Sequence, residues 1–355
     1  MDSTYYLAGT ASSTESILEQ FSDLVESLRS YDLIPAQSGQ GQYLISVNHN
    51  PNAYKKFIRS GGSSKRAVLI MLEPSAVFPS QYKKRVQQKY SLVLAPGNAH
   101  YSPTGKSFIP WPYESIPNPL RPLHQNSDSI SNAQHFFDPS FFNFENWVSR
   151  SKFLVMINAN KVSPISIENY SLRRKVASTI PGDFLSVYGG LWNSSLTSRI
   201  KHRLGVAWFS IKSGVLPNLW HIYGNLLRHY PNAYGEVADK QVVLRNAKFS
   251  VVIENDSNYV SEKLFDSVIN GCIPIYYGGE LPTRDILKDL AIPLDCEPQL
   301  IIEKLESLSE NEIRKYLKSM SDFVRSSEFV ENWTKPRVFQ LIAKEIANHL
   351  KDPNV

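Results

Sequence analysis

Short apolar runs recur in the second half of the chain and alternate with stretches of helical periodicity. The runs are KFLVMI (152–157), FLSVYGG (184–190), FSVVI (249–253) and IPIYY (273–277). Continuous apolar runs of this length are typical of strands in a parallel sheet, because connecting helices cover both of its faces. The pattern therefore predicts a doubly wound α/β domain in this part of the chain.

The N-terminal part of the chain also combines a helical pattern with short apolar runs. Ser12 and Glu15 resemble a capping box, and the apolar spacing that follows predicts one amphipathic helix over 13–30. Apolar runs at 43–47, 67–72 and 91–95 predict three strands, separated by Gly, Ser and Pro. These elements indicate a small α/β domain.

A change of composition between 101 and 145 suggests a boundary. This stretch is rich in Pro, Asn, Ser and aromatic residues, and closely spaced prolines forbid regular structure. A chain of 355 residues also exceeds the usual size of one core. We therefore predict a domain at 1–125, a linker at 126–150, a second domain at 151–335 and a C-terminal helix at 336–355.

The overall composition is that of a globular protein, with 42% hydrophobic and 20% charged residues. The net charge of +5 arises from 38 basic and 33 acidic residues without a dense basic run. The charge fits an anionic ligand or a membrane surface but requires neither. A nucleic-acid partner is not expected, because no basic and aromatic motif accompanies this charge.

The sequence favours a cytoplasmic location. Cys272 and Cys296 are too few for a disulfide framework or a cysteine zinc site, which favours a reducing compartment. The N-terminus lacks the pattern of a signal peptide, and no run approaches the roughly 20 apolar residues of a spanning helix. Peripheral association with the inner face of the membrane stays open, since the C-terminal helix could contact either a membrane or the first domain.

The segment ENDSNYVSEKL (254–264) joins a predicted strand to a predicted helix. Asn258 or Ser261 can cap this helix, and Gly271 can end it. Lys263 then lies in the first helical turn, where a cation opposes the helix dipole by about 0.3–1 kcal/mol. Either Lys263 is a solvated surface residue, or an anion binds at this helix N-terminus.

Residues 248–282 resemble the C-terminal signature of the α-1,3/α-1,4-fucosyltransferases, glycosyltransferase family 10. The shared features are EN, a short loop, YVSEKL, an apolar helix, Gly271 and IPIYYGG. The missing cysteine pairs and membrane anchor of secreted animal members make a bacterial or viral type the closer match.

The resemblance implies an α/β protein of GT-B architecture, with two Rossmann-like domains facing a central cleft. The first domain would bind the acceptor and the second the nucleotide sugar. The implied reaction is inverting transfer of fucose from GDP-fucose to a hydroxyl of a glycan, such as O3 of a GlcNAc or glucose unit in a lipopolysaccharide or other surface polysaccharide. Alternatives are a different nucleotide sugar, or a glycan-binding relative without catalysis.

The same resemblance implies roles for single residues. Lys263 matches the lysine that contacts the diphosphate, and Glu262 and Tyr259 match the groups that hold the ribose. Asn255, with Glu254 before it, matches the start of the donor-binding loop.

A second diphosphate cation is implied in SLRRKVASTI after the first strand of the second domain. Arg173 fits better than Arg174, because Val176 and Ile180 then take the apolar positions that follow the family arginine. The alternative is an exposed basic start of a helix.

The implied catalytic base is Glu73, which ends the run AVLIMLE in the first domain. A carboxylate there could accept the proton of the acceptor hydroxyl. The alternative is an ordinary acid in a strand-to-turn transition.

No metal or cofactor is expected beyond the donor substrate. No two aspartates are spaced as DxD, and the eight histidines show no metal-ligand spacing, so Arg173 and Lys263 would carry the diphosphate charge. Three departures from the family pattern concern the donor site: Ser261 replaces a threonine, Tyr277 replaces a tryptophan, and the loop 256–258 is short. Gly189 and Gly190 could approach the donor or form a tight turn.

Overall fold

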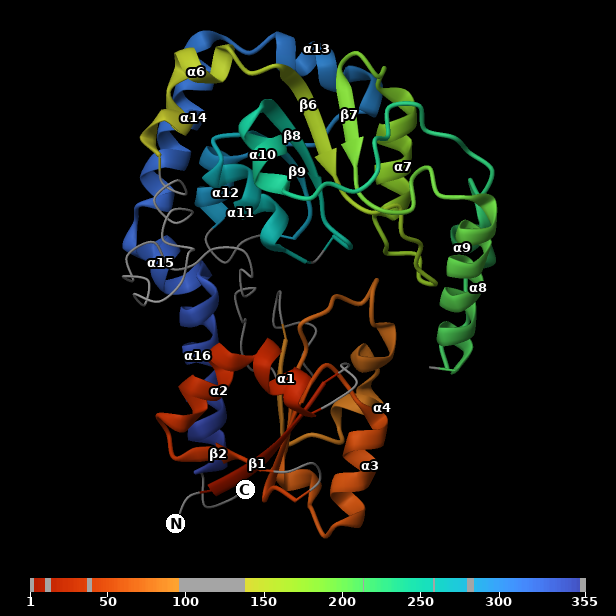
Figure 1. Ribbon diagram of the computed structural model, residues 1–355, viewed down its shortest axis with the longest axis vertical. Coiled ribbons are helices and arrows are strands. Elements are labelled where there is room, and N and C mark those ends of the chain that lie inside the picture. Colours follow the sequence, from red (N-terminus) through yellow and green to blue (C-terminus); the bar gives the residue numbers. More distant parts are fainter. Residues whose placement is uncertain are drawn as a thin grey trace. The chain divides into compact units, whose positions relative to one another are not determined.

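The computed structural model describes residues 3–9, 14–36, 40–95, 138–212, 214–257, 259–279 and 284–351. The chain divides into two units, one of Met1–Asn118 with Glu331–Val355 and one of Pro119–Val330. Each unit contains a five-stranded sheet in which all described strand pairs are parallel (Figure 1). The predicted α/β class is therefore confirmed.

The first sheet has the strand order β2-β1-β3-β4-β5. Its strands are β1 (Ser3–Ala8), β2 (Leu33–Pro35), β3 (Tyr43–Val47), β4 (Ala67–Ile70) and β5 (Leu92–Leu94). The three predicted strands are confirmed as β3, β4 and β5, whereas β1 and β2 were not predicted. In the register, Ile45 pairs with Val68, and Leu69 pairs with Val93.

Short helices surround this sheet. They are α1 (Thr14–Gln20), α2 (Ser22–Arg29), α3 (Pro51–Arg59), α4 (Lys84–Gln87), η1 (Ser64–Arg66) and η2 (Pro79–Tyr82). The prediction of one helix over 13–30 is wrong, because the chain leaves helical geometry at Phe21, with φ −112° and ψ 35°. Phe21 is buried edge-on against Phe339, and this contact accompanies the break.

The C-terminal helix α16 (Lys335–Leu350) belongs to the first unit. It packs against α2 and β5 and contributes Val338, Phe339 and Ile342 to the core that Leu24 and Leu28 of α2 also enter. The sequence left open whether this helix contacts a membrane or the first domain, and in the structure it packs on the first domain.

The second sheet has the order β10-β9-β8-β6-β7. Its strands are β6 (Lys152–Ile157), β7 (Leu185–Tyr188), β8 (Ala247–Ile253), β9 (Ile273–Tyr277) and β10 (Ile292–Pro293). The four predicted strands are confirmed, and β10 is an addition. From β6 the chain proceeds to β7 on one side, whereas β8, β9 and β10 follow on the other side.

The helices of the second unit cover and extend this sheet. They are η4 (Pro139–Phe142), α6 (Phe144–Val148), α7 (Tyr170–Thr179), α8 (Leu196–Lys212), α9 (Leu219–Tyr223), α10 (Lys240–Arg245), α11 (Glu262–Ile269), α12 (Arg284–Leu290), η5 (Pro298–Leu300), α13 (Ile301–Glu306), α14 (Glu310–Val324) and α15 (Ser327–Trp333). Elements η4 and α6 occupy the described part of the predicted linker. Among the described helices, none has the length and apolar character needed to cross a bilayer.

Candidate functional site

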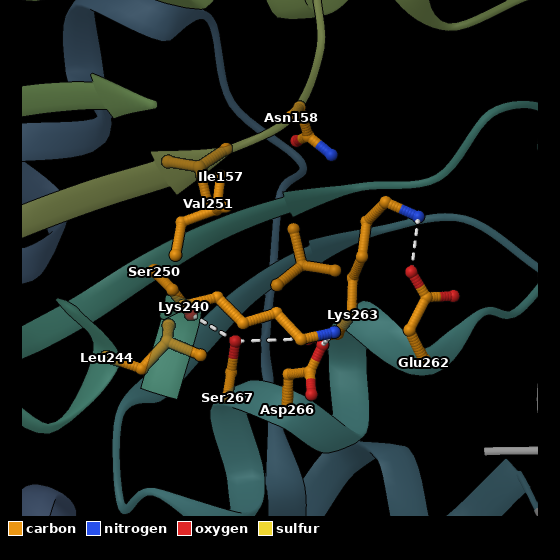
Figure 2. Close-up of a pocket in the computed structure, with 11 residues that line it drawn as sticks. Ile157, Asn158, Lys240, Leu244, Ser250, Val251, Glu262, Lys263, Asp266 and Ser267 are labelled. Carbon is orange, nitrogen blue, oxygen red and sulfur yellow. Dashed lines mark hydrogen bonds and ion pairs between the residues drawn. The ribbon is translucent and has the colours of Figure 1, made fainter. Parts of the chain in front are cut away.

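The strand order of the second unit creates a topological switch point between β6 and β8. The connections leave these adjacent strands in opposite directions, and ligands of open α/β sheets bind outside the carboxyl ends of strands at such a point. A cavity of about 180 Å³ lies here (Figure 2). It is lined by Ile157, Asn158, Lys240, Leu244, Ser250, Val251, Val252, Glu262, Lys263, Asp266 and Ser267.

Lys263 enters the cavity wall from the first turn of α11. Ser261 is the N-cap of this helix, and its hydroxyl accepts a hydrogen bond from the Lys263 backbone N–H. The Lys263 ammonium donates to Ser261 Oγ at 3.0 Å and to Glu262 Oε1 at 3.4 Å. With 23% of its side chain exposed, Lys263 is fixed beside the cavity and does not extend freely into solvent. The predicted cap at Ser261 is confirmed, and Asn258 lies outside the described residues.

The rest of α11 matches the sequence prediction as well. Leu264, Phe265, Val268 and Ile269 are all buried on its inner side. Gly271, with φ +60°, follows the last helical residues in the left-handed conformation that favours glycine.

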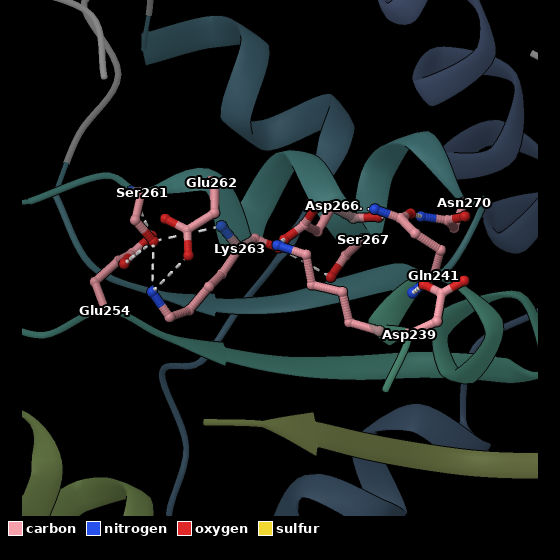
Figure 3. Close-up of polar contacts among 10 residues, drawn as sticks. Asp239, Gln241, Glu254, Ser261, Glu262, Lys263, Asp266, Ser267 and Asn270 are labelled. Carbon is pink, nitrogen blue, oxygen red and sulfur yellow. Dashed lines mark hydrogen bonds and ion pairs between the residues drawn. The ribbon is translucent and has the colours of Figure 1, made fainter. Parts of the chain in front are cut away.

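Glu254 lies beneath this helix start and is fully buried. Its Oε1 accepts the Ser261 backbone N–H at 2.8 Å and its Oε2 accepts the Ser261 hydroxyl at 2.6 Å (Figure 3). Burial raises the pKa of Glu254, although Lys263 and the two bonds from Ser261 oppose this effect. Both carboxylate oxygens therefore bind Ser261, and Glu254 positions the helix start.

Glu262 lines the cavity beside Lys263. Burial disfavours its ionised form, but Lys263 and Lys240 outweigh that effect and keep the pKa of Glu262 below its usual value. The cavity wall thus combines the carboxyl groups of Glu262 and Asp266 with the ammonium groups of Lys240 and Lys263.

Arg173 lies in α7, and its buried side chain contacts the end of β8. Its Nε donates to the Ile253 carbonyl at 3.0 Å, and its Nη2 donates to Asn255 Oδ1 at 3.0 Å. It is buried, and burial lowers the pKa of its guanidinium, while Tyr170 and nearby carboxylates, including Glu254, oppose this shift. The alternative of an exposed basic helix start is therefore wrong for Arg173.

Asn255 and Tyr259 are not among the residues that line the cavity. The Asn255 carbonyl accepts the backbone N–H of Asn169, which joins the loop to the start of α7. Tyr259 is buried, and its carbonyl accepts the backbone N–H of Gly279. Of the residues predicted for the donor site, Glu262 and Lys263 are the two in this cavity wall.

Glu73 lies in the first unit, three residues beyond the end of β4. Its N–H donates to Asn48 Oδ1 at 3.2 Å, and its carbonyl accepts from Gln81 Nε2 at 2.9 Å and from the Tyr82 hydroxyl at 3.0 Å. These bonds fix the backbone at Glu73 on both sides, a suitable support for a positioned carboxylate.

Lys240 and Asp266 were not predicted but line the same cavity. Lys240 is the first residue of α10, and its ammonium forms an ion pair of 2.6 Å with the buried Asp266. The sequence contains a signal for it, because Lys240 follows the capping residue Asp239 and opposes the dipole of its helix in the same way as Lys263.

Asn158 is the other unpredicted group. It follows β6 directly and is buried in the cavity wall, where both polar atoms of its amide lack a hydrogen-bond partner among the described residues. Its backbone is fixed, since its N–H donates to Tyr188 and its carbonyl accepts from Trp192 Nε1 at 2.5 Å. A Cβ at Gly189 would lie 2.4 Å from this carbonyl, so close packing against Asn158 explains that glycine.

Comparison with known proteins identifies the fold. No family model and no curated protein sequence matches the chain. A glycosyltransferase from Rickettsia africae ESF-5 superposes with a TM-score of 0.51 at 8% identity, over 98% of each chain. The Anabaena protein HepE, crystallised with UDP, gives a TM-score of 0.51 at 10% identity, over 98% of this chain and 100% of that chain.

An α1,3-fucosyltransferase gives a TM-score of 0.48 at 14% identity, over 98% of this chain and 90% of that chain, and this similarity is too low to carry an argument. The first two similarities and the two parallel sheets show that the chain has a GT-B-like α/β fold.

Proposed function

We propose that this protein is a glycosyltransferase that binds a nucleotide sugar in the second unit and transfers its sugar to a glycan. The observation that supports this proposal is the cavity at the switch point, where Lys240, Lys263 and the unpartnered amide of Asn158 lie together. The ammonium groups of Lys240 and Lys263, which a diphosphate would share with Asp266 and Glu262, and the N-terminus of α11 suit this ligand. An amide can bond to phosphate, ribose or base.

We further propose that the donor is GDP-fucose and that the enzyme belongs to the family 10 fucosyltransferases. The support is the run of residues from Glu254 through Lys263 to the IPIYYGG segment, of which Glu262, Lys263, Asp266 and Ser267 line the cavity. The sequence lacks DxD, so the proposal needs no metal: Lys263 and Lys240 stabilise the charge that develops on the leaving diphosphate.

The remaining residues have supporting roles in this proposal. Glu262 accepts hydrogen bonds from the ribose hydroxyls, and the buried Tyr259 joins the loop before α11 to Gly279. Glu254 holds Ser261 and, through it, Lys263. Arg173 adds positive charge to the donor loop and positions Asn255, since its guanidinium donates to the Asn255 side chain.

In the proposed reaction the acceptor hydroxyl attacks the anomeric carbon of fucose. The new bond joins this carbon to the acceptor oxygen, the bond to the β-phosphate oxygen breaks, and the configuration inverts. The hydroxyl proton passes to Glu73 and the electron pair leaves with GDP. The acceptor is a GlcNAc- or glucose-containing glycan, such as a lipopolysaccharide or another surface polysaccharide, and the reaction takes place in the cytoplasm or at the inner face of the membrane.

A different nucleotide sugar is the second candidate. HepE, which shares the fold, was crystallised with UDP, and the loop 256–258 that would contact the donor is short. A glycan-binding relative without turnover is the third, because fold alone does not establish catalysis.

Calorimetric titration of the full chain with GDP, UDP, GDP-fucose and UDP-glucose separates these candidates. We expect saturable binding of GDP and GDP-fucose that is at least about 10-fold tighter than binding of the uridine nucleotides. GDP release with GlcNAc-containing oligosaccharides then tests transfer. Preference for UDP would assign another donor, binding without release in the presence of every glycan offered would favour the non-catalytic relative, and no nucleotide binding would overturn the proposal.

A further inference from the structure

Helix α8 turns its apolar side toward solvent. Large apolar residues recur along it every three or four positions, which places them on one face. They are Leu196, Ile200, Leu204, Trp208 and Ile211, and all are exposed, Trp208 to 70%. The buried residues of the helix are polar, namely Arg203 and Ser210. This distribution is the reverse of that in an amphipathic helix packed on its own domain.

Hydrogen bonds to the chain that follows α8 fix this orientation. Arg203 Nη1 donates to the Gly224 carbonyl at 3.0 Å, and Ser210 Oγ donates to the Val215 carbonyl at 2.7 Å. Arg199 Nη1 donates to the carbonyl of Arg228 at 2.9 Å. The polar face of α8 is therefore bonded inside the unit, and the apolar face is left outside.

The neighbouring helix continues the apolar character. Helices α8 and α9 pack side by side (Figure 1), and Leu216, Trp220 and Leu227 around α9 are exposed to 93%, 83% and 77%. Single exposed apolar residues are ordinary, but a full helix face with two exposed tryptophans nearby marks an interaction site. We call the apolar face of α8 together with these three residues the α8–α9 surface.

The charged groups of the same segment are all basic. Residues 184–235 contain five Lys and Arg and no Asp or Glu, so the remainder of the chain has 33 basic and 33 acidic residues. Lys201 and Lys212 are exposed, and the helical repeat places both at one edge of the apolar face of α8. The segment that carries the α8–α9 surface therefore has a formal net charge of +5.

We propose that the α8–α9 surface docks on an anionic lipid membrane. Its Leu, Ile and Trp side chains would enter the boundary between headgroups and acyl chains, and Lys201 and Lys212 would contact anionic headgroups. Helices that lie in a membrane interface combine an apolar face with basic flanks, and anionic lipids attract such flanks.

Charge and side-chain type favour this partner over two others. In a symmetric pair of copies, two surfaces without any acid would face each other, and their positive charges would repel. Single-stranded nucleic acid is also anionic, but aliphatic side chains such as Leu204 and Leu216 offer no ring on which bases can stack.

Flotation of the full chain with lipid vesicles tests the proposal. We use vesicles of phosphatidylcholine alone and vesicles with about one-third phosphatidylglycerol, at low and at physiological salt. The chain should float with the mixed vesicles and much less with the neutral ones, and higher salt should weaken binding. The double variant Trp208→Ser/Trp220→Ser and the double variant Lys201→Glu/Lys212→Glu should each lower the partition coefficient about 10-fold or more.

Matched controls use exposed residues elsewhere in the same unit. Val148→Ser/Leu300→Ser and Lys315→Glu/Lys318→Glu should leave vesicle binding unchanged. Equal floating of parent and tryptophan variant, or no floating of the parent, would overturn the proposal. Concentration-dependent dimerisation that Trp208→Ser abolishes would assign the surface to a second copy, and displacement of the vesicles by a short single-stranded RNA would assign it to nucleic acid.

Discussion

The hydroxyl of Ser261 donates a 2.6 Å hydrogen bond to Oε2 of the fully buried Glu254. The same hydroxyl oxygen accepts from the backbone N–H and the ammonium of Lys263. One serine therefore connects a buried carboxylate at the end of β8 to the cation in the cavity wall. The geometry of the proposed diphosphate site depends on this connection.

Replacing Ser261 with alanine should destabilise the protein more than loss of a cap alone. The free energy of unfolding should fall by about 2–4 kcal/mol, because the helix loses its N-cap and the Glu254 carboxylate loses a buried donor. Urea unfolding followed by circular dichroism measures this change. The matched control is Ser309→Ala at the exposed capping box of α14, which should cost only about 1 kcal/mol. Equal losses of unfolding free energy in Ser261→Ala and Ser309→Ala would contradict the proposed role of the Ser261–Glu254 hydrogen bond.

The ionisation of Glu254 should make stability depend on pH. Its pKa is raised in the folded state, so between its unfolded and folded pKa values the native state binds more protons than the unfolded state. Stability contributed by protonated Glu254 is therefore present below the unfolded value, about 4.3, and is lost as the pH rises through the folded value. Unfolding free energies of the parent and of Glu254→Gln should be measured from about pH 4, near the unfolded pKa, upward. As the pH rises, the parent should lose stability relative to the variant. A difference that stays constant would show that Glu254 has an ordinary pKa.

The sequence predicted the strands that form the centre of each sheet, because a parallel strand covered on both faces needs a continuous apolar run. It missed β2 and β10, which have three and two residues and exist through pairing with β1 and β9. It also missed β1, where STYYLA carries hydroxyl groups that obscure the apolar run. At the break between α1 and α2, Phe21 packs against Phe339, a residue far away in sequence.

Residues of the candidate site could be predicted from the sequence where they are adjacent in one segment. Ser261, Glu262 and Lys263 are consecutive; Glu262 and Lys263 line the cavity, and Ser261 accepts a hydrogen bond from the Lys263 ammonium. Lys240 and Asn158 belong to other elements, and only the order of the strands brings them to the same place. The prediction of Arg173 as a second diphosphate cation could not foresee its bonds to Ile253 and Asn255, since these depend on how α7 packs on β8.

Lys263→Met should weaken GDP binding at least about 10-fold, because the variant loses a charge-assisted contact with the diphosphate. Titration calorimetry measures the dissociation constant, and circular dichroism checks that the variant is folded. Lys315→Met, at an exposed position of α14, is the control and should bind GDP like the parent. Unchanged affinity in Lys263→Met would remove this lysine from the site.

Lys240 needs a paired design because its partner is buried. Lys240→Met alone leaves Asp266 without its ion pair and should lower the unfolding free energy by about 2 kcal/mol. The double variant Lys240→Met/Asp266→Asn should regain most of this stability, since the buried carboxylate is gone. If Lys240 contacts the donor, GDP affinity falls in both variants; if it is purely structural, the stable double variant binds like the parent.

Glu73→Gln should separate catalysis from donor binding. The amide keeps the size of the side chain but cannot accept the acceptor proton, so turnover should fall about 10²–10⁴-fold while the dissociation constant of GDP stays unchanged. Assays of GDP release and calorimetry provide the two readouts. Glu26→Gln, on an exposed position of α2, is the control and should retain turnover. Full activity of Glu73→Gln would exclude it as the base.

Asn158→Ala should leave stability nearly unchanged and weaken nucleotide binding. The amide has no hydrogen-bond partner among the described residues, so its removal costs no internal bond and the unfolding free energy should change by less than about 1 kcal/mol. A lost bond to a charged phosphate should weaken GDP binding about 10-fold, and Asn158→Asp should weaken it further, because a carboxylate beside Lys263 repels the anion. The contrasting control is Asn232→Ala: the buried Asn232 amide donates to the Ala177 carbonyl at 3.0 Å, so that variant should lose stability without losing affinity. If the two alanine variants behave alike in both measurements, Asn158 is a packing residue and the cavity binds its ligand without it.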